Sequence, residues 1–192
     1  MKLRLTPSST PHLSLTDEDI APYVSFIKLP SYELRQTVKV VVRDSEKRIA
    51  LVTSLRHGLY LLPGGGTETN DLQKEAEREC EEEINFNVKI LDVVATADEF
   101  RNNSGKKYET TCFSAKILSE SPSDTRTEHE KVNDLRVEWF TRVEALDIAA
   151  TQKQKLVSGD IEFYNIKFNI LRDGFFIECF YEREAHVKNS LT

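Results

Sequence analysis

The sequence predicts an α+β fold in which helices pack on a mixed β-sheet. Strand-like segments, a glycine-rich turn, a helix, a strand hairpin, one more strand and further helices follow one another, without the regular alternation of strand and helix that a doubly wound sheet requires. Hydrophobic residues make up 39% of the 192 residues and charged residues 30%, so the chain has enough apolar material for a core. This length suits one domain of ordinary size with a short extension.

The two ends of the chain differ from its middle. Residues 1–34 are rich in Ser, Thr and Pro, and the prolines interrupt any regular element there. We therefore expect residues 1–34 to form an N-terminal extension that packs on the domain or on a second subunit, or frays. The main domain is expected to span residues 35–150, and residues 151–192 are expected to be a helical segment packed on the same domain.

Five segments have the composition of β-strands, because β-branched and other apolar residues dominate them and polar turns separate them. Two of them flank a turn at 46–48. Two others flank the polar segment 101–107, which indicates a hairpin. The five segments are 37–44, 49–54, 87–100, 108–118 and 135–140. The polar segment 119–131 is predicted to be a loop.

Residues 71–84 have the pattern of an amphipathic helix. Apolar side chains recur there every four residues and form one stripe. This stripe consists of Leu72, Ala76, Cys80 and Ile84. Asp71 is a good N-cap for a helix that starts at the next residue.

Two later segments also have helical spacing. They are 141–148 and 160–172, and Gly174 is expected to end the second helix. The segment 175–184 suits either a strand or a helix.

The predicted helix 71–84 carries several carboxylates on one face. Glu79, Glu82 and Glu83 stand at i, i+3 and i+4, where like charges repel one another and weaken an isolated helix. A divalent cation would reverse that effect, and carboxylate oxygens suit Mg²⁺ or Mn²⁺. The alternative is an ordinary solvated acidic face. Arg78 favours the metal site because it can orient a carboxylate, and the glycines at 64–66 allow close approach of the backbone.

The stretch from Gly64 to Phe86 resembles the Nudix box, G-x5-E-x7-R-E-U-x-E-E-x-G-U, in which U is an aliphatic residue. The matching residues are Gly64, Arg78, Glu79, Glu82 and Glu83, with Phe86 at the last apolar position. Cys80 occupies an aliphatic position, which a buried thiol can fill. Asn85 replaces the glycine that ends the helix, and Asn enters the left-handed region more easily than most residues. The resemblance covers roughly residues 36–150.

This resemblance implies an α/β/α sandwich and the hydrolysis of a phosphoanhydride bond in a nucleoside diphosphate linked to another group. Nucleoside triphosphates or related nucleotides are the expected substrates, because the signatures of ADP-ribose and coenzyme A hydrolases are absent from the sequence. The implied catalytic residues are Arg78, Glu79, Glu82 and Glu83, and the three glutamates are the implied ligands of Mg²⁺ or Mn²⁺. Arg78 would fix a metal-binding glutamate.

Other residues complete the expected site. Gly64 and Gly65 are candidates for substrate binding, and so is Arg56, for which a solvent-exposed position at a strand end is the alternative. The general base is expected to be a carboxylate of the box or a loop glutamate. The loop candidates are Glu128 and Glu130, and for each of them an ordinary solvated charge is the alternative.

Asn70 is the departure from the box with the largest consequence. It stands where the family has a Glu that supports the arginine, so we expect Arg78 to have a weaker, uncharged contact there. Asp71 could replace that Glu if the turn shifted by one residue, although its N-cap role fits the helix better. Asn70 therefore supports an alternative function, a nucleotide-binding regulator with weak catalysis. The intact Glu79, Glu82 and Glu83 favour the enzyme.

Composition limits the partners. The chain has 26 Lys and Arg against 32 Asp and Glu, a net charge of −6, so we do not expect a nucleic-acid partner. No apolar run is long enough to cross a membrane, and the N-terminus has no apolar segment of a signal peptide. The cysteines Cys80, Cys112 and Cys179 are far apart in the sequence, which favours a reducing, cytoplasmic location. The terminal segments could serve a homodimer.

Overall fold

The computed structural model describes residues 10–21, 23, 25–54, 58–121 and 135–189. Seven strands form one mixed sheet in the order β1-β5-β6-β2-β3-β4, with β7 paired to β3. The strands are β1 (His12–Leu15), β2 (Glu33–Arg43), β3 (Ile49–Ser54), β4 (Leu59–Leu61), β5 (Phe86–Arg101), β6 (Lys106–Glu120) and β7 (Leu135–Phe140). β1 runs parallel to β5 and β2 runs parallel to β6, whereas the other pairs are antiparallel.

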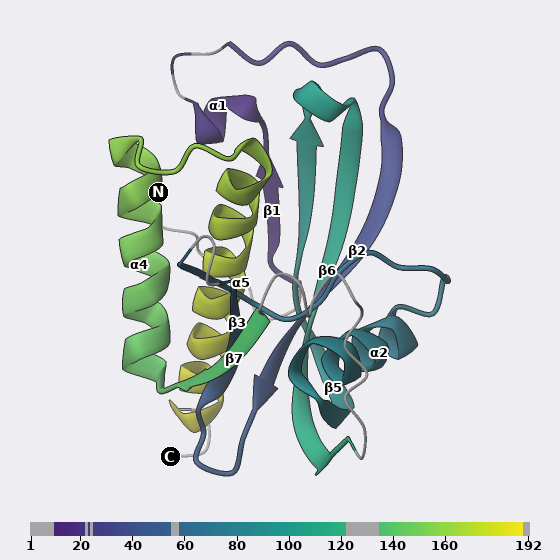
Figure 1. Ribbon diagram of the computed structural model, residues 1–192, viewed down its shortest axis with the longest axis vertical. Helices are drawn as coiled ribbons and strands as arrows, with labels where there is room; N and C mark the ends of the chain where they lie inside the picture. The colour runs from purple at the N-terminus through teal and green to yellow at the C-terminus, as the bar shows by residue number, and fades with distance from the viewer. Residues whose placement is uncertain (1–9, 22, 24, 55–57, 122–134, 190–192) are drawn as a thin grey trace.

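Helices cover both faces of the sheet, which confirms the predicted α/β/α sandwich. Helix α2 (Leu72–Ile84) lies on one face, and helices α4 (Arg142–Ser158) and α5 (Tyr164–Asn189) lie on the other (Figure 1). The short helices are α1 (Asp17–Ile20) and the 3₁₀ turn η1 (Asn102–Ser104). None of the helices in the described part of the chain combines the length and apolar character that a membrane span needs.

Alternation along β2 divides the core between the two faces. Val38, Val40 and Val42 pack against the apolar stripe of α2, whereas Val41 packs with residues of α5. These four valines are fully buried, so β2 lies in the core between the two helical layers. This strand also borders the glycine-rich turn.

The N-terminal part of the chain joins the sheet. β1 pairs with β5 from His12, opposite Thr96, to Leu15, opposite Glu99. Leu15 and Ile20 then pack with Phe168 of α5 in a small core cluster. The first long strand, β2, begins at Glu33, earlier than predicted. Its pairing with β6 extends to this residue, which lies opposite Lys106.

The C-terminal helices are longer than the sequence pattern predicted. Helix α4 continues to Ser158 and ends at Gly159 in the left-handed conformation (φ 86°). Helix α5 runs through Gly174, so the prediction that this glycine ends a helix is wrong. The ambiguous segment 175–184 is helical. Gly174 lies where α5 meets α4, and a Cβ built on it would be 3.7 Å from Cβ of Ala149.

Candidate active site

The glycine-rich turn between β4 and α2 is attached to the edge of β2. The N–H of Val38 donates to the carbonyl of Gly65 over 2.9 Å, and the N–H of Val40 donates to the carbonyl of Pro63 over 3.0 Å. Gly64 has a φ of +124°, and a Cβ on it would come within 2.3 Å of the Val38 carbonyl oxygen. Only glycine fits this position, because both the backbone conformation and the close approach exclude a side chain.

The start of the same turn is held from two sides. Lys39 of β2 is buried, and its Nζ donates to the carbonyl oxygens of Leu62, over 2.8 Å, and of Gly64. The carboxylate of Asp173 in α5 accepts from the N–H of Leu62 over 3.0 Å. The turn is therefore fixed by backbone and side-chain contacts from both neighbouring elements.

Helix α2 begins and ends as the sequence predicted. Asp71 is its N-cap and accepts from the N–H of Lys74 over 3.3 Å. Asn85 ends it in the left-handed conformation, with φ 61° and ψ 32°. The buried stripe of Ala76, Cys80 and Ile84 packs against the valines of β2 and so fixes the orientation of the helix.

Arg78 lies at the centre of the box carboxylates. Its Nη1 is 2.5 Å from Oε2 of Glu82, and its Nη2 is 2.6 Å from Oε1 of Glu79. The same Nη2 also donates to the carbonyl of Gly66 over 3.2 Å. One guanidinium therefore joins two carboxylates of the helix to the turn.

The turn and the helix contact each other at two further points. The N–H of Gly64 donates to Oε2 of Glu83 over 2.7 Å. A Cβ on Gly65 would lie 2.7 Å from Oε2 of Glu79, so the missing side chain makes room for that carboxylate. Glu79, Glu82 and Glu83 thus face the turn formed by the glycines that sequence analysis selected.

Burial raises the pKa of Glu79, which is only 7% exposed, and the positive charge of Arg78 opposes that rise. The pKa of Arg78 is itself raised, because the attraction of Glu79, Glu75 and Glu82 outweighs the effect of burial. The arginine therefore stays charged and keeps its carboxylate partners oriented.

Glu75 is a residue of the site that sequence reasoning did not select. Its carboxylate accepts from the N–H groups of Glu68 and Thr69, from Oγ1 of Thr69, and from Nε and Nη2 of Arg78. The hydrogen bond from Thr69, together with those from Glu68 and Arg78, lowers the pKa of Glu75. The expected weak anchor of Arg78 is therefore wrong, because a buried carboxylate binds it. The position of Glu75 three residues before Arg78 was the available signal.

Not every predicted site residue can be placed. Arg56, Glu128 and Glu130 lie outside the described residues. Within the described part of the chain, no three His, Cys, Asp or Glu side chains form a group that could hold a metal ion by themselves. The carboxylates of Glu79, Glu82 and Glu83 nevertheless share the helix face that borders the turn.

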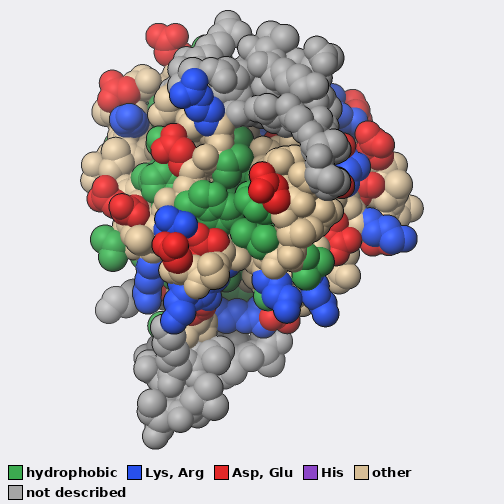
Figure 2. All heavy atoms as spheres, turned by 60° about the horizontal axis from the view of Figure 1, so that its bottom comes forward, with side chains coloured by type: hydrophobic (Ala, Val, Ile, Leu, Met, Phe, Trp, Pro, Cys, Tyr) green, Lys and Arg blue, Asp and Glu red, His purple; other side chains and the backbone are tan. Residues whose placement is uncertain are grey.

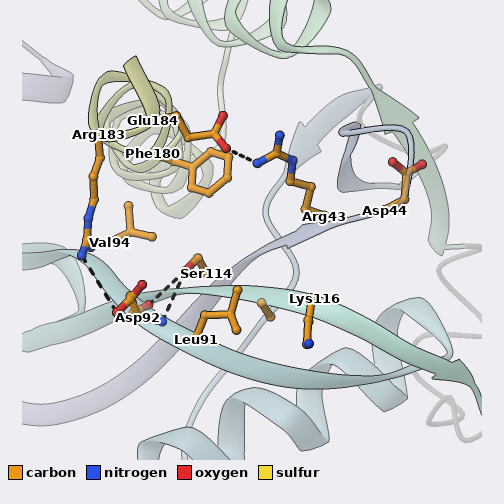
Figure 3. Close-up of a pocket in the computed structure, with 11 residues that line it drawn as sticks. Arg43, Asp44, Leu91, Asp92, Val94, Ser114, Lys116, Phe180, Arg183 and Glu184 are labelled. Atoms are coloured by element: carbon orange, nitrogen blue, oxygen red, sulfur yellow. Dashed lines mark hydrogen bonds and ion pairs between the residues drawn. The ribbon is translucent and has the colours of Figure 1, made fainter. Parts of the chain in front are cut away.

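A pocket of about 390 Å³ lies elsewhere, between α5 and strands β2, β5 and β6 (Figure 3). Arg43 forms an ion pair with Glu184 across it, and Arg183 lies 4.0 Å from Asp92. Phe180 and Val94 contribute apolar surface. Of the described residues that line this pocket, none belongs to α2 or to the glycine-rich turn, so it is separate from the box carboxylates.

Comparison with known proteins agrees with the fold. A Nudix hydrolase from Nitrosomonas europaea has a TM-score of 0.51 and 17% identity, over 68% of this chain and 93% of that one. The MutT protein from Methanosarcina mazei Go1 has a TM-score of 0.47 and 14% identity, over 70% of this chain and all of that one. No curated protein matches the sequence.

The family comparison covers more than half of the chain. The model of the NUDIX domain matches residues 33–164, which include the glycine-rich turn, α2 and all strands except β1. Enzymes of this family generally need divalent metal ions. The chain therefore belongs to the NUDIX family and is a pyrophosphohydrolase of the Nudix type.

Proposed function

We propose that this chain hydrolyses a phosphoanhydride bond in a nucleoside diphosphate linked to another group, with Mg²⁺ or Mn²⁺ as cofactor. Nucleoside triphosphates or related nucleotides are the proposed substrates. The observation that carries the proposal is the arrangement around Arg78, which holds Glu79 and Glu82 at a glycine turn whose N–H binds Glu83. Three carboxylates are thereby oriented beside the glycine-rich turn.

The donor chemistry of this group suits a hard divalent cation. Mg²⁺ is usually bound by one or two carboxylates, several waters and substrate phosphates, so a complete cage of protein ligands is not needed. Glu79, Glu82 and Glu83 would hold the metal. When bound, such an ion neutralises phosphate charge and lowers the pKa of a bound water.

The chain's own residues supply position and proton transfer. Arg78 fixes the planes of two carboxylates. Gly64 and Gly65, which border these carboxylates, are proposed as contacts to the substrate. Water attacks phosphorus, the bridging P–O bond breaks, and the water proton passes to a carboxylate base. That base is a glutamate of the box or one of the loop residues Glu128 and Glu130. Arg56 is proposed as a further contact to the substrate.

A nucleotide-binding regulator is the second candidate function, because Asn70 departs from the box. Such a protein would bind nucleotides and hydrolyse none of them. The charged contact of Glu75 with Arg78 favours the enzyme, since it keeps the arginine oriented without a carboxylate at position 70.

The proposed partner is a small nucleotide, and the proposed location is the cytoplasm. Cys80, Cys112 and Cys179 are all free and buried, as a reducing compartment allows.

On the face in Figure 2, acidic and basic side chains lie around a central apolar area. The net charge of −6 gives no long-range attraction to nucleic acid. A homodimer is compatible with the terminal segments.

Replacing the metal-binding carboxylates tests this function. Glu79→Gln and Glu83→Gln should each lower the rate of hydrolysis of a nucleotide panel on the order of a thousandfold. This corresponds to a loss of several kcal/mol of transition-state stabilisation. The matched control is Glu77→Gln, because Glu77 is an exposed residue of the same helix. Near-normal turnover in Glu83→Gln would contradict the proposed role of the box carboxylates.

The broken bond can be tested with ¹⁸O-labelled water. Hydrolysis of a phosphoanhydride places the label on one phosphorus-containing product and leaves the other unlabelled. Label at a sugar carbon would contradict the proposed reaction. Nucleotide binding without hydrolysis across the panel would support the regulator instead.

A further inference from the structure

We propose that Glu75 is the positioning residue that orients Arg78, and so replaces the box carboxylate that is missing at Asn70. This inference rests on the proposed function, because it assigns Glu75 to the arrangement that presents Glu79 and Glu82. It concerns how the carboxylates are held and adds no metal ligand.

Glu75 is buried within the site. It is only 4% exposed, whereas Asn70 is exposed. Among the described residues, no hydrogen bond joins Asn70 to Arg78, so position 70 leaves that contact to another residue. An ionised carboxylate at such a buried position needs several donors, because burial without partners is costly.

The two oxygens of Glu75 make different contacts. Oε1 accepts from the N–H of Thr69 over 3.1 Å and from its Oγ1 over 2.7 Å. Oε2 accepts from the N–H of Glu68 over 3.2 Å, and from Nε and Nη2 of Arg78 over 3.2 and 3.1 Å. The carboxylate of Glu75 therefore joins the turn that precedes α2 to Arg78, which lies within that helix.

The contact with Arg78 sets the direction of its remaining donors. A guanidinium is planar and rigid, so an acceptor that binds both Nε and Nη2 fixes the plane of the whole group. Nη1 then donates to the carboxylate of Glu82, and Nη2 also donates to that of Glu79. Glu75 thereby acts on the proposed metal ligands through Arg78 and would not itself hold the metal.

Binding of Mn²⁺ in the absence of substrate tests this role, with electron paramagnetic resonance measuring the free ion. Glu75→Gln should weaken Mn²⁺ binding about tenfold or more, because loss of a residue that orients metal ligands typically costs 10–100-fold. The rate of hydrolysis should fall in parallel, and Glu77→Gln should match the natural protein in both measurements. Mn²⁺ binding by Glu75→Gln equal to that of the natural protein would overturn the inference.

Two further variants separate orientation from simple stability. Thr69→Val removes one hydrogen bond to Glu75 but leaves Arg78 bound, so it should lower the melting temperature and preserve Mn²⁺ binding. Adding Asn70→Glu to Glu75→Gln should restore Mn²⁺ binding at least in part. Equal loss of Mn²⁺ binding in Thr69→Val and Glu75→Gln, or no recovery in the double variant, would overturn the inference.

Glu75→Asp keeps the measurement possible if Glu75→Gln does not fold. The shorter side chain cannot reach both Thr69 and Arg78, so Mn²⁺ binding should again be weaker than in the natural protein, and equal binding would contradict the role. A different result would contradict the proposed function: full hydrolytic activity of Glu79→Gln. If Glu79→Gln is inactive but Glu75→Gln has normal Mn²⁺ binding and hydrolysis, only the role of Glu75 is overturned.

Discussion

Three consecutive glycines in the turn before α2 have different structural roles. Gly64 has a positive φ and lies against the backbone of Val38, Gly65 faces the carboxylate of Glu79, and Gly66 has open space where a Cβ would stand. The residue type is the same in all three cases, but the cost of adding a methyl group is different at each position.

Alanine substitutions in this turn should separate these roles. Gly64→Ala should destabilise the protein by about 2 kcal/mol or more and remove most hydrolysis, because the turn must leave the edge of β2. Gly66→Ala is the matched control and should retain both stability and activity. Urea unfolding and nucleotide hydrolysis measure the two effects. A Gly64→Ala protein as stable as Gly66→Ala would contradict the packing described for the turn.

The residues of the site differ in how well the sequence predicted them. The spacing of Glu79, Glu82 and Glu83 predicted their shared helix face, and the chemistry of Asn85 predicted its left-handed conformation. The role of Glu75 could not be predicted in the same way. It depends on the N–H groups of Glu68 and Thr69, which the fold of the turn brings to the helix.

At the scale of elements, α2 was predicted with accurate ends because its signals are local. An apolar stripe, an N-cap and a residue suited to the left-handed region all lie within it. β1 has only four residues, and its place beside β5 depends on contacts with residues more than eighty positions away. Local sequence pattern carries no information about such a pairing, so the N-terminal part was predicted only as an extension.

Helix α5 shows how packing can decide the meaning of a glycine. Glycine is common at the end of a helix, and Gly174 was therefore predicted to end one. The helix continues because apolar side chains before and after Gly174 pack into the core. Its missing Cβ would meet Cβ of Ala149 at 3.7 Å, which is an ordinary van der Waals contact. The close approach of α4 and α5 therefore does not require glycine here.

Gly174→Ala should accordingly stabilise the protein. Alanine is favoured over glycine inside a helix by roughly 0.5–1 kcal/mol, and there is room for the added methyl group. Gly159→Ala is the opposite control, because Gly159 ends α4 with φ +86°. This variant should have a free energy of unfolding lower by about 1 kcal/mol. The free energies of unfolding in urea measure both changes. Destabilisation by Gly174→Ala would show that α4 and α5 pack more tightly than described.

At the scale of the whole molecule, buried charges connect α5 to the sheet and to the site. Glu99 of β5 is fully buried, and it forms ion pairs with Arg101 of the same strand and with Arg172 of α5 over 3.0 Å. Arg172 also binds Asp173 over 2.9 Å, and these two carboxylates keep its pKa raised against the effect of burial. Asp173 in turn binds the N–H of Leu62 at the start of the glycine-rich turn.

The matched NUDIX domain ends at residue 164, where α5 begins. The sheet nevertheless depends on α5 for much of the core on that face. Phe168, Ile170, Phe176, Ile177 and Phe180 of this helix are all buried. Each large apolar side chain contributes about 1.5–3 kcal/mol when it is buried, so the five together match the whole stability of a typical domain, about 5–15 kcal/mol.

A chain of residues 1–163 should therefore not fold. Its loss of α5 would expose the core beneath that helix and would leave Glu99 and Arg101 without Arg172, at a cost of a few kcal/mol more. Circular dichroism with urea unfolding should find no cooperative transition. Removal of residues 187–192 is the control, because the described core ends at Tyr181, and it should preserve the transition. A cooperative transition of chain 1–163 at the urea midpoint of the full chain would contradict the role given to α5.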